Sequence, residues 1–150
     1  MSDLAFMQRA IELASYAEQQ DEVPVGAVLV FDDQIIGEGY NNPITSMDVT
    51  AHAEIQAIRA ACQQQNNYRL PDSTLYVTLE PCSMCAGAIV HARIARVVIA
   101  TREPRAGAAG SALDILNNDK FNHQCDVEFG LCENESSSLL KEFFKRRRNK

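Results

Sequence analysis

A strand, a helix and a second strand follow one another in the middle of the chain, and this unit constrains the fold more than any other feature. Residues 74–79 are mostly apolar and β-branched, residues 83–92 have helical spacing, and residues 96–100 are again apolar. Two strands joined by a helical crossover usually lie parallel in one sheet. The unit therefore predicts an α/β fold.

The rest of the chain adds a hairpin and further helices to this unit. A strand over 25–31 is followed by a turn at Asp32-Asp33 and a return strand over 34–40. The other expected elements are helices over 4–17, 52–62, 113–116 and 135–148 and a last strand over 127–131, whereas 41–43 and 101–112 are expected loops. We therefore expect a five-stranded mixed sheet with helices on both faces, in a single three-layer α/β/α domain spanning residues 1–150.

The composition agrees with one globular domain. The chain has 150 residues, of which 46% are hydrophobic and 23% charged, so disorder over most of its length is excluded. It lacks any apolar run of the roughly 20 residues that would cross a bilayer, and its start shows no secretory signal. Five cysteines, an odd number, argue against a disulfide framework and for metal binding or catalysis. We expect a cytoplasmic protein without a membrane association.

Two short motifs carry candidate chemistry, His-Ala-Glu at residues 52–54 and Pro-Cys-Ser-Met-Cys at residues 81–85. Cys82 and Cys85 are three residues apart at the start of a predicted helix, so both sulfur atoms lie on one face. The proline before them suits a helix entrance, and the positive end of the helix dipole favours the thiolate that a metal binds. His52 also opens a predicted helix, so the three side chains can converge over the ends of the sheet.

Two thiolates and one imidazole form a ligand set that selects zinc over calcium or magnesium. Structural zinc sites are usually closed by four protein ligands, whereas three leave a position for water. His91 and His123 are the other histidines, but one lies at the far end of the helix that Cys82 opens and the other in a polar loop. We interpret His52, Cys82 and Cys85 as the ligands of one zinc ion. The remaining histidines are interpreted as solvent-facing or locally hydrogen-bonded.

Two glutamates adjoin the predicted ligands. Glu54 lies two residues after His52, where its carboxylate can approach the open coordination position. A carboxylate there can take a proton from the metal-bound water and return it to a leaving nitrogen. Glu80 follows a predicted strand, where it is expected only to orient the adjoining loop.

The charge distribution is uneven. Residues 141–150 hold six of the fourteen Lys and Arg residues and one acid, so this segment carries a net charge of +5. The rest of the chain carries −11, and the total is −6. Considered alone, the basic segment is better explained as a solubilising tail than as a phosphate contact.

The two motifs resemble the H-x-E and P-C-x-x-C signature of the zinc-dependent nucleoside and base deaminases. Over nearly its whole length, the sequence also resembles one branch of that superfamily, the bacterial deaminases of the wobble adenosine in transfer RNA. The matching segments are 23–28, 39–41, 50–54, 68–70, 74–82, 84–88, 107–111 and the aromatic pair 143–144. The signature bears on the chemistry, whereas only the wider similarity bears on an RNA substrate.

The resemblance implies a cytidine-deaminase-like domain with one zinc ion per subunit, held by His52, Cys82 and Cys85. Zinc-bound hydroxide would attack C6 of adenine, with Glu54 as the proton shuttle, and the products would be inosine and ammonia. The implied protein is a hydrolase of transfer-RNA processing. It would act as a homodimer on the anticodon stem-loop.

The resemblance also assigns residues to substrate binding. Asn41 matches a residue that hydrogen-bonds the flipped nucleoside, and Val25 matches one that lines the base pocket. The backbone N–H of Ala53 is expected to bind the edge of the base. Without the resemblance, Asn41 would be interpreted as a turn residue and Val25 as an ordinary core residue.

In the family, the end of the C-terminal helix approaches the anticodon stem-loop, whose bases are read by stacking and by edge hydrogen bonds. The candidate RNA contacts there are Phe144, Lys145, Arg147 and Arg148. Glu103 is a further candidate at a position where the family has Asp, and its additional methylene keeps the charge but changes the reach. Because Phe143 and Phe144 also fit an apolar stripe, at least one of them is expected in the core.

Two other functions use the same site. One is a deaminase of a free base or nucleotide, of the guanine or cytosine type, although a basic tail has little use on a small neutral substrate. A histidine as the first ligand also disfavours the free-cytidine branch, where cysteine is common. The other is a zinc-binding interaction module without catalysis, which would have no need of Glu54 beside an open metal position.

Overall fold

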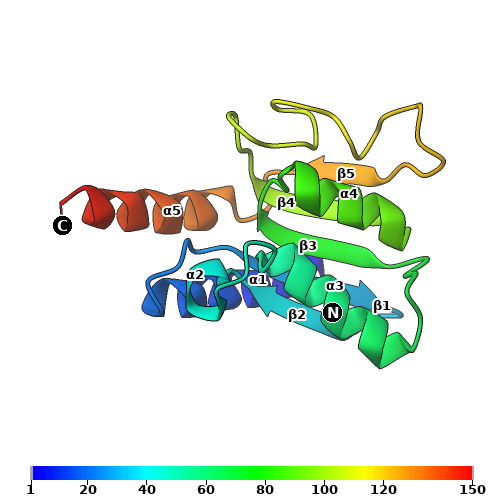
Figure 1. Cartoon of the computed structure of the whole chain (residues 1–150), viewed down its shortest axis with the longest axis horizontal. Coiled ribbons are helices and arrows are strands. Elements are labelled where there is room, and N and C mark those ends of the chain that lie inside the picture. The colour runs from blue at the N-terminus through cyan, green and yellow to red at the C-terminus, as the bar shows by residue number, and fades with distance from the viewer. Residues whose placement is uncertain (1, 150) are drawn as a thin grey trace.

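A five-stranded mixed sheet runs through the molecule in the order β2-β1-β3-β4-β5 (Figure 1). The computed structural model describes residues 2–149, so that Met1 and Lys150, the last cation of the basic segment, lie outside the described residues. The strands are β1 (Gly26–Phe31), β2 (Gln34–Tyr40), β3 (Thr74–Leu79), β4 (Arg96–Thr101) and β5 (Asp126–Phe129). β1 is antiparallel to β2 and β3, whereas β4 is parallel to β3 and β5, which confirms the predicted mixed sheet.

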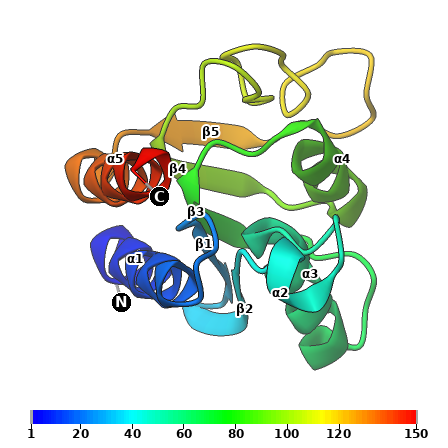
Figure 2. The same cartoon turned by 60° about the vertical axis from the view of Figure 1, so that its left-hand side comes forward.

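Helices cover both faces of the sheet. They are α1 (Asp3–Gln19), α2 (Pro43–Ser46), α3 (Ala53–Gln65), α4 (Ser83–Ala92) and α5 (Glu133–Arg148). α1 and α5 lie on one face and α3 and α4 on the other, which confirms the three layers (Figure 2). Among the described helices, none combines the length and apolar character needed to cross a membrane.

Alternating strand residues supply two separate apolar cores. Leu75 and Val77 of β3 belong to the core under α3 and α4, whereas Tyr76 between them belongs to the core under α1. Ile99 and Val98 of β4 divide between the two cores in the same way. Because a slip of one residue would exchange the two faces, this alternation fixes where each strand ends and thus where the loops begin.

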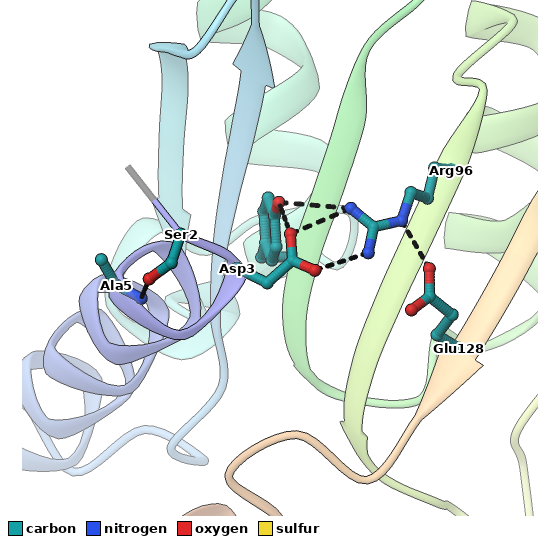
Figure 3. Close-up of polar contacts among 6 residues, drawn as sticks. Ser2, Asp3, Ala5, Arg96 and Glu128 are labelled. Carbon is teal, nitrogen blue, oxygen red and sulfur yellow. Dashed lines mark hydrogen bonds and ion pairs between the residues drawn. The ribbon is translucent and has the colours of Figure 1, made fainter.

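An ion-pair cluster ties the N-terminal ends of the parallel strands to α1 (Figure 3). Arg96, the first residue of β4, donates to the two carboxylate oxygens of Asp3 at 3.0 and 2.7 Å and to Glu128 of β5 at 2.5 Å. The Tyr76 hydroxyl donates to the same Asp3 carboxylate at 2.5 Å. The cluster therefore joins α1, β3, β4 and β5 at one end of the sheet.

The structure departs from the sequence-based elements in two loops. Residues 113–116 do not form the expected helix, because Asp114 pairs with Ala109 in an isolated bridge and the Ile115 N–H donates to the Ala108 carbonyl at 2.8 Å. Backbone groups that a helix would use are thus bonded to the preceding loop. By contrast, the loop expected after residue 40 contains the short helix α2, with Pro43 in its first turn.

Candidate active site

Four strand ends meet at the edge of the sheet opposite the Arg96 cluster. β3 and β4 end there, β2 ends there, and β1 begins there. His52 is the residue before α3 and Cys82 the residue before α4, each with an extended backbone at the helix cap. Gly39 of β2 allows α3 this close to the sheet, since a Cβ on Gly39 would lie 2.2 Å from the Ala53 carbonyl oxygen. Two helix N-termini therefore meet at this edge.

The structure brings His52, Cys82 and Cys85 together. His52 Nδ1 lies 3.7 Å from Cys82 Sγ and 3.5 Å from Cys85 Sγ, and the three ligand atoms lie within 4.8 Å of one another. Zinc bonds of about 2.3 Å to sulfur and 2.0 Å to nitrogen, at tetrahedral angles, place sulfur and nitrogen about 3.5 Å apart. The donors therefore fit one zinc ion. Within the part of the chain that the structure describes, no further His, Cys, Asp or Glu joins them.

The other histidines lie apart from this group. The His91 side chain is exposed near the end of α4. His123 Nε2 is hydrogen-bonded to the Ile94 carbonyl at 2.7 Å. Both positions agree with the interpretation of these residues as solvent-facing and locally hydrogen-bonded, and His52, Cys82 and Cys85 remain the three candidate metal ligands among the described residues.

The ligand side chains influence one another's protonation. Hydrogen bonds from Cys85 and His52 lower the pKa of Cys82 to about 3, although burial opposes this. The hydrogen bond with Cys82 and then burial raise the pKa of Cys85, and the hydrogen bond to Cys82 also raises the pKa of His52. Cys82 is therefore the group that most readily presents a thiolate. A coordinating metal deprotonates a thiol outright, which would bring Cys85 to the same state.

Glu54 lies in the first turn of α3, and only 4% of it is exposed. Burial raises its pKa to about 7, and the charge of Cys82 adds to this increase, whereas a hydrogen bond to the backbone and the charge of His52 oppose it. Glu54 is not one of the three clustered donors. A buried carboxylate that can hold a proton near neutral pH, next to a three-ligand metal site, is equipped for general acid–base catalysis.

The comparisons with known proteins identify the family. Residues 1–101 match the sequence profile of the cytidine and deoxycytidylate deaminase zinc-binding region. The chain belongs to the cytidine and deoxycytidylate deaminase family. The tRNA-specific adenosine deaminase of Haemophilus influenzae is 50% identical to it over 147 residues, which are 97% of this chain and 85% of the relative. These matches confirm the predicted zinc-dependent deaminase.

Two solved structures resemble this deaminase. One comes from work on A-to-I editing by tRNA:A34 deaminases at the wobble position of transfer RNA. It superposes with a TM-score of 0.88 at 46% identity and covers 91% of this chain and 99% of that chain. The guanine deaminase of Bacillus subtilis has a TM-score of 0.67 at 46% identity and covers 74% of this chain and 71% of that chain. The α/β fold is therefore confirmed.

The residues predicted to bind the substrate lie next to one another in this deaminase. The Asn41 N–H donates to the Val25 carbonyl at 3.1 Å, and Asn41 Oδ1 accepts from the Ala53 N–H at 3.2 Å. Val25 is 5% exposed and packs in the core under α3 and α4. The Ala53 N–H is thus bonded to Asn41 here, so a base that used this N–H would have to replace the Asn41 carboxamide.

Glu80 organises the loop after β4. Glu80 is 3% exposed as a residue. Its carboxylate accepts from the N–H groups of Glu103, Ala109 and Ser111 at 3.0, 2.9 and 3.1 Å, and from the Ser111 hydroxyl at 2.5 Å. Burial by itself would raise the pKa of Glu80, but these hydrogen bonds hold it below its usual value. Gly107 completes the unit, because a Cβ there would lie 2.4 Å from the Glu80 Cδ. The loop expected over 101–112 is therefore fixed by one buried acid.

A groove of about 420 Å³ lies between α5 and the ends of β3 and β4. Glu103, Phe144 and Arg148, three of the predicted RNA contacts, line it. So do two cations that the sequence analysis did not select, Arg102 and Lys141. α5 projects from the same end of the sheet as α2 (Figure 1). The groove thus combines an aromatic side chain and three cations.

The aromatic pair of α5 divides between the core and the surface. Phe143 is 1% exposed, whereas Phe144 is 44% exposed. Lys145 and Arg147 are exposed, and the Arg147 guanidinium lies 5.0 Å from the centre of the Phe143 ring. Glu103 accepts from the Arg105 N–H at 2.9 Å, so its carboxylate closes a local turn. Among the predicted RNA contacts, the residues of α5 have more accessible side chains than Glu103.

Proposed function

We propose that this deaminase hydrolyses adenosine to inosine and ammonia at the wobble position of a transfer-RNA anticodon. The observation that carries the proposal is the three-donor metal site with a buried carboxylate beside it, in a chain similar to tRNA-specific adenosine deaminases over nearly its full length. The similarity to the structure from the tRNA:A34 deaminase work supports the wobble position.

His52, Cys82 and Cys85 would hold one zinc ion per subunit. Bound zinc supplies the Lewis acidity that lowers the pKa of a water ligand to about 7. Glu54 accepts a proton from the attacking water and delivers it to the nitrogen that leaves C6 as ammonia. Its burial keeps bulk water away from this proton transfer, and Glu54, in the first turn of α3, is not one of the three clustered donors.

Substrate recognition is assigned to two regions. Asn41, Val25 and the Ala53 N–H would seat the flipped nucleoside, with the base taking over the Ala53 N–H from Asn41. Phe144, Lys145, Arg147 and Arg148 would contact the flanking anticodon stem-loop by stacking and charge. Glu103 borders the same groove.

The proposal includes a homodimer in the cytoplasm, built from one domain over residues 1–150. Exposed apolar side chains near the site edge support self-association, since Ile44, Met47 and Val49 are 62%, 93% and 82% exposed. The five cysteines are all free, which agrees with a reducing compartment. Light scattering of the purified protein tests the dimer.

The test is inosine formation by the zinc-loaded protein on an anticodon stem-loop RNA with adenosine at the wobble position. The matched control is the same RNA with that adenosine moved one position, and free adenosine, guanine and cytosine are assayed in parallel. Inosine at the wobble position alone supports the proposal. Activity only on a free base contradicts the RNA substrate but keeps the site chemistry, and inactivity of the zinc-loaded protein on every substrate contradicts both.

The second candidate is deamination of free guanine. It is favoured by the 46% identity to the Bacillus subtilis guanine deaminase over 74% of this chain. The guanine arm of the same assay tests it, with xanthine and ammonia as products. The basic α5 end has no function on this small substrate, which is why the RNA reaction is preferred.

A further inference from the structure

Glu22 is a buried acid outside the proposed chemistry. It is 1% exposed, and its carboxylate accepts from the Thr45 N–H at 2.7 Å, the Thr45 hydroxyl at 2.7 Å and the Ile44 N–H at 3.4 Å. No Lys, Arg or His among the described residues forms an ion pair with it. Because a buried charge without a cation is costly, these N–H and O–H donors are what make its burial tolerable.

The backbone of Glu22 is held independently of these contacts. Its N–H donates to the Ala17 carbonyl at 3.1 Å, in the last turn of α1. α1 packs on the face of the sheet opposite α3 and α4 (Figure 2). The carboxylate therefore connects a helix on one face of the sheet with the start of α2 at the site edge.

The segment that Glu22 holds is also bonded to the start of α3. The Asn42 N–H donates to the Ala51 carbonyl at 3.0 Å, and Asn42 Oδ1 accepts from the Gln56 side chain at 2.8 Å. Asn41 Oδ1 accepts from the Ala53 N–H, between His52 and Glu54. Residues 41–46 are therefore fixed by α3 on one side and by Glu22 on the other.

We propose that Glu22 is a positioning residue that fixes α2 and thereby the orientation in which Asn41 is presented to the substrate nucleoside. This rests on the proposed function, in which Asn41 binds the flipped base. Glu22 does not touch the metal donors or the reacting atoms in this assignment. Its removal therefore affects substrate binding more than the chemical step.

Glu22→Ala is expected to raise the KM for the stem-loop RNA by about tenfold or more, since small displacements of binding groups cost that much. The kcat changes less, and zinc content stays at one per chain. Glu22→Gln keeps the shape and one acceptor oxygen, so its KM falls between those of the wild type and Glu22→Ala. Hydrogen exchange at residues 42–46 is faster in Glu22→Ala, a readout that does not depend on activity.

Thr45→Val tests the same contact from the solvent side, because Thr45 is exposed and its substitution leaves the core intact. The KM of Thr45→Val rises less than that of Glu22→Ala, because valine removes only the hydroxyl donor and keeps the backbone N–H. The double variant is no worse than Glu22→Ala, because the hydrogen bond that Thr45→Val removes is already absent there. Asp3→Asn is the control for general destabilisation, since it breaks an ion pair at the other end of the sheet and leaves KM unchanged.

An unchanged KM in Glu22→Ala with a lower Tm would overturn the proposal and leave Glu22 with a role in stability alone. Additive effects of Glu22→Ala and Thr45→Val on KM would show that Glu22 does not act through its contact with Thr45. A wild-type protein that forms no inosine contradicts the proposed function instead. In that case unchanged hydrogen exchange at residues 42–46 in Glu22→Ala would separately contradict the proposal that Glu22 fixes α2.

Discussion

The two ends of the sheet hold their carboxylates in opposite ways. At the metal end, Glu22, Glu54 and Glu80 are at most 4% exposed, and none of them is ion-paired to a described Lys or Arg. At the other end, Asp3 and Glu128 both pair with one arginine, and their side chains are 44% and 54% exposed. In the proposed function, the same chemical group serves placement and proton transfer at one end, whereas it forms surface ion pairs at the other.

The difference shows where charge is used for function. Exposed ion pairs contribute roughly 0–1 kcal/mol, so the Arg96 cluster can be altered with little loss. Buried carboxylates that accept several backbone N–H groups define a loop conformation, because the alternative is an unsatisfied buried charge. Substitutions at the metal end should therefore change activity, and those at the other end should change only stability.

The largest effect is expected from Glu54→Ala. Removing the proposed proton shuttle should lower kcat by about 10²–10⁴-fold while zinc remains bound, because Glu54 is not among the three clustered donors. Metal content by atomic absorption and single-turnover inosine formation measure the two separately. His52→Ala is the matched comparison and should lose zinc as well. Near-normal turnover in zinc-loaded Glu54→Ala would show that the buried carboxylate is not the shuttle.

The next effect concerns Gly107 in the loop held by Glu80. In Gly107→Ala the new Cβ would lie 2.4 Å from Glu80 Cδ and 2.5 Å from the Glu103 carbonyl oxygen, so the loop must shift. Overpacking of this kind costs about 1–3 kcal/mol of the free energy of unfolding, which urea denaturation measures.

Gly87 provides the matched control for this substitution. A Cβ on Gly87, inside α4, meets nothing within 4 Å, so Gly87→Ala should be neutral or raise the stability by up to about 1 kcal/mol. Equal stabilities of Gly107→Ala and the wild type would mean that the loop held by Glu80 adapts. The contrast between the buried, hydrogen-bonded carboxylates of the metal end and the exposed ion pairs of the other end would then weaken.

A smaller effect is expected from the basic end of α5. Removing residues 145–150 should weaken binding of the stem-loop RNA and flatten its salt dependence, since each phosphate contact contributes about 0.7–0.9 to the slope of log K against log salt. Fluorescence anisotropy at several salt concentrations measures both. Arg9→Ala is the control, because Arg9 is already paired with Glu12 and Glu38. If the slope and the Kd stay constant after the truncation, the segment is a solubilising tail.

The sequence was most informative where chemistry depends on local spacing. Cys82 and Cys85 lie at helical spacing behind a proline, and the apolar alternation of β3 and β4 is visible residue by residue. The role of Glu22 was missed because its partner Thr45 is 23 residues away and no periodicity links them. The signal available in the sequence was the position of Glu22, an acidic residue directly before the apolar segment that leads into β1.

The two errors of secondary structure have the same origin. α2 has only four residues, and Glu22 supplies acceptors for its first N–H groups, so its stability comes from a distant part of the chain. Residues 113–116 satisfy local helix criteria but form hydrogen bonds with the preceding loop. Short segments follow such tertiary contacts more than their own propensity.

The smallest effect is expected at the Arg96 end of the sheet, in how the stability depends on pH under acidic conditions. Hydrogen bonds from Arg96 and Tyr76 lower the pKa of Asp3 from 3.8 to about 2. Because the pKa of Asp3 is lower in the folded state than in the unfolded state, its ionised carboxylate contributes fully to the free energy of unfolding above about pH 4. This contribution is lost as the pH falls toward 2. Because both partners are partly exposed, the loss should stay below about 1 kcal/mol.

Asp3→Asn should accordingly lower the stability slightly at pH 6 and approach the wild type as the pH falls from 4 to 2, while kcat and KM at neutral pH stay the same. Urea midpoints of the two proteins at several pH values measure the convergence. A constant difference across this range would mean that the ionisation of Asp3 does not stabilise the fold. A changed KM would break the division of roles between the two ends, because it would connect the exposed ion-pair cluster to the site at the far edge of the sheet.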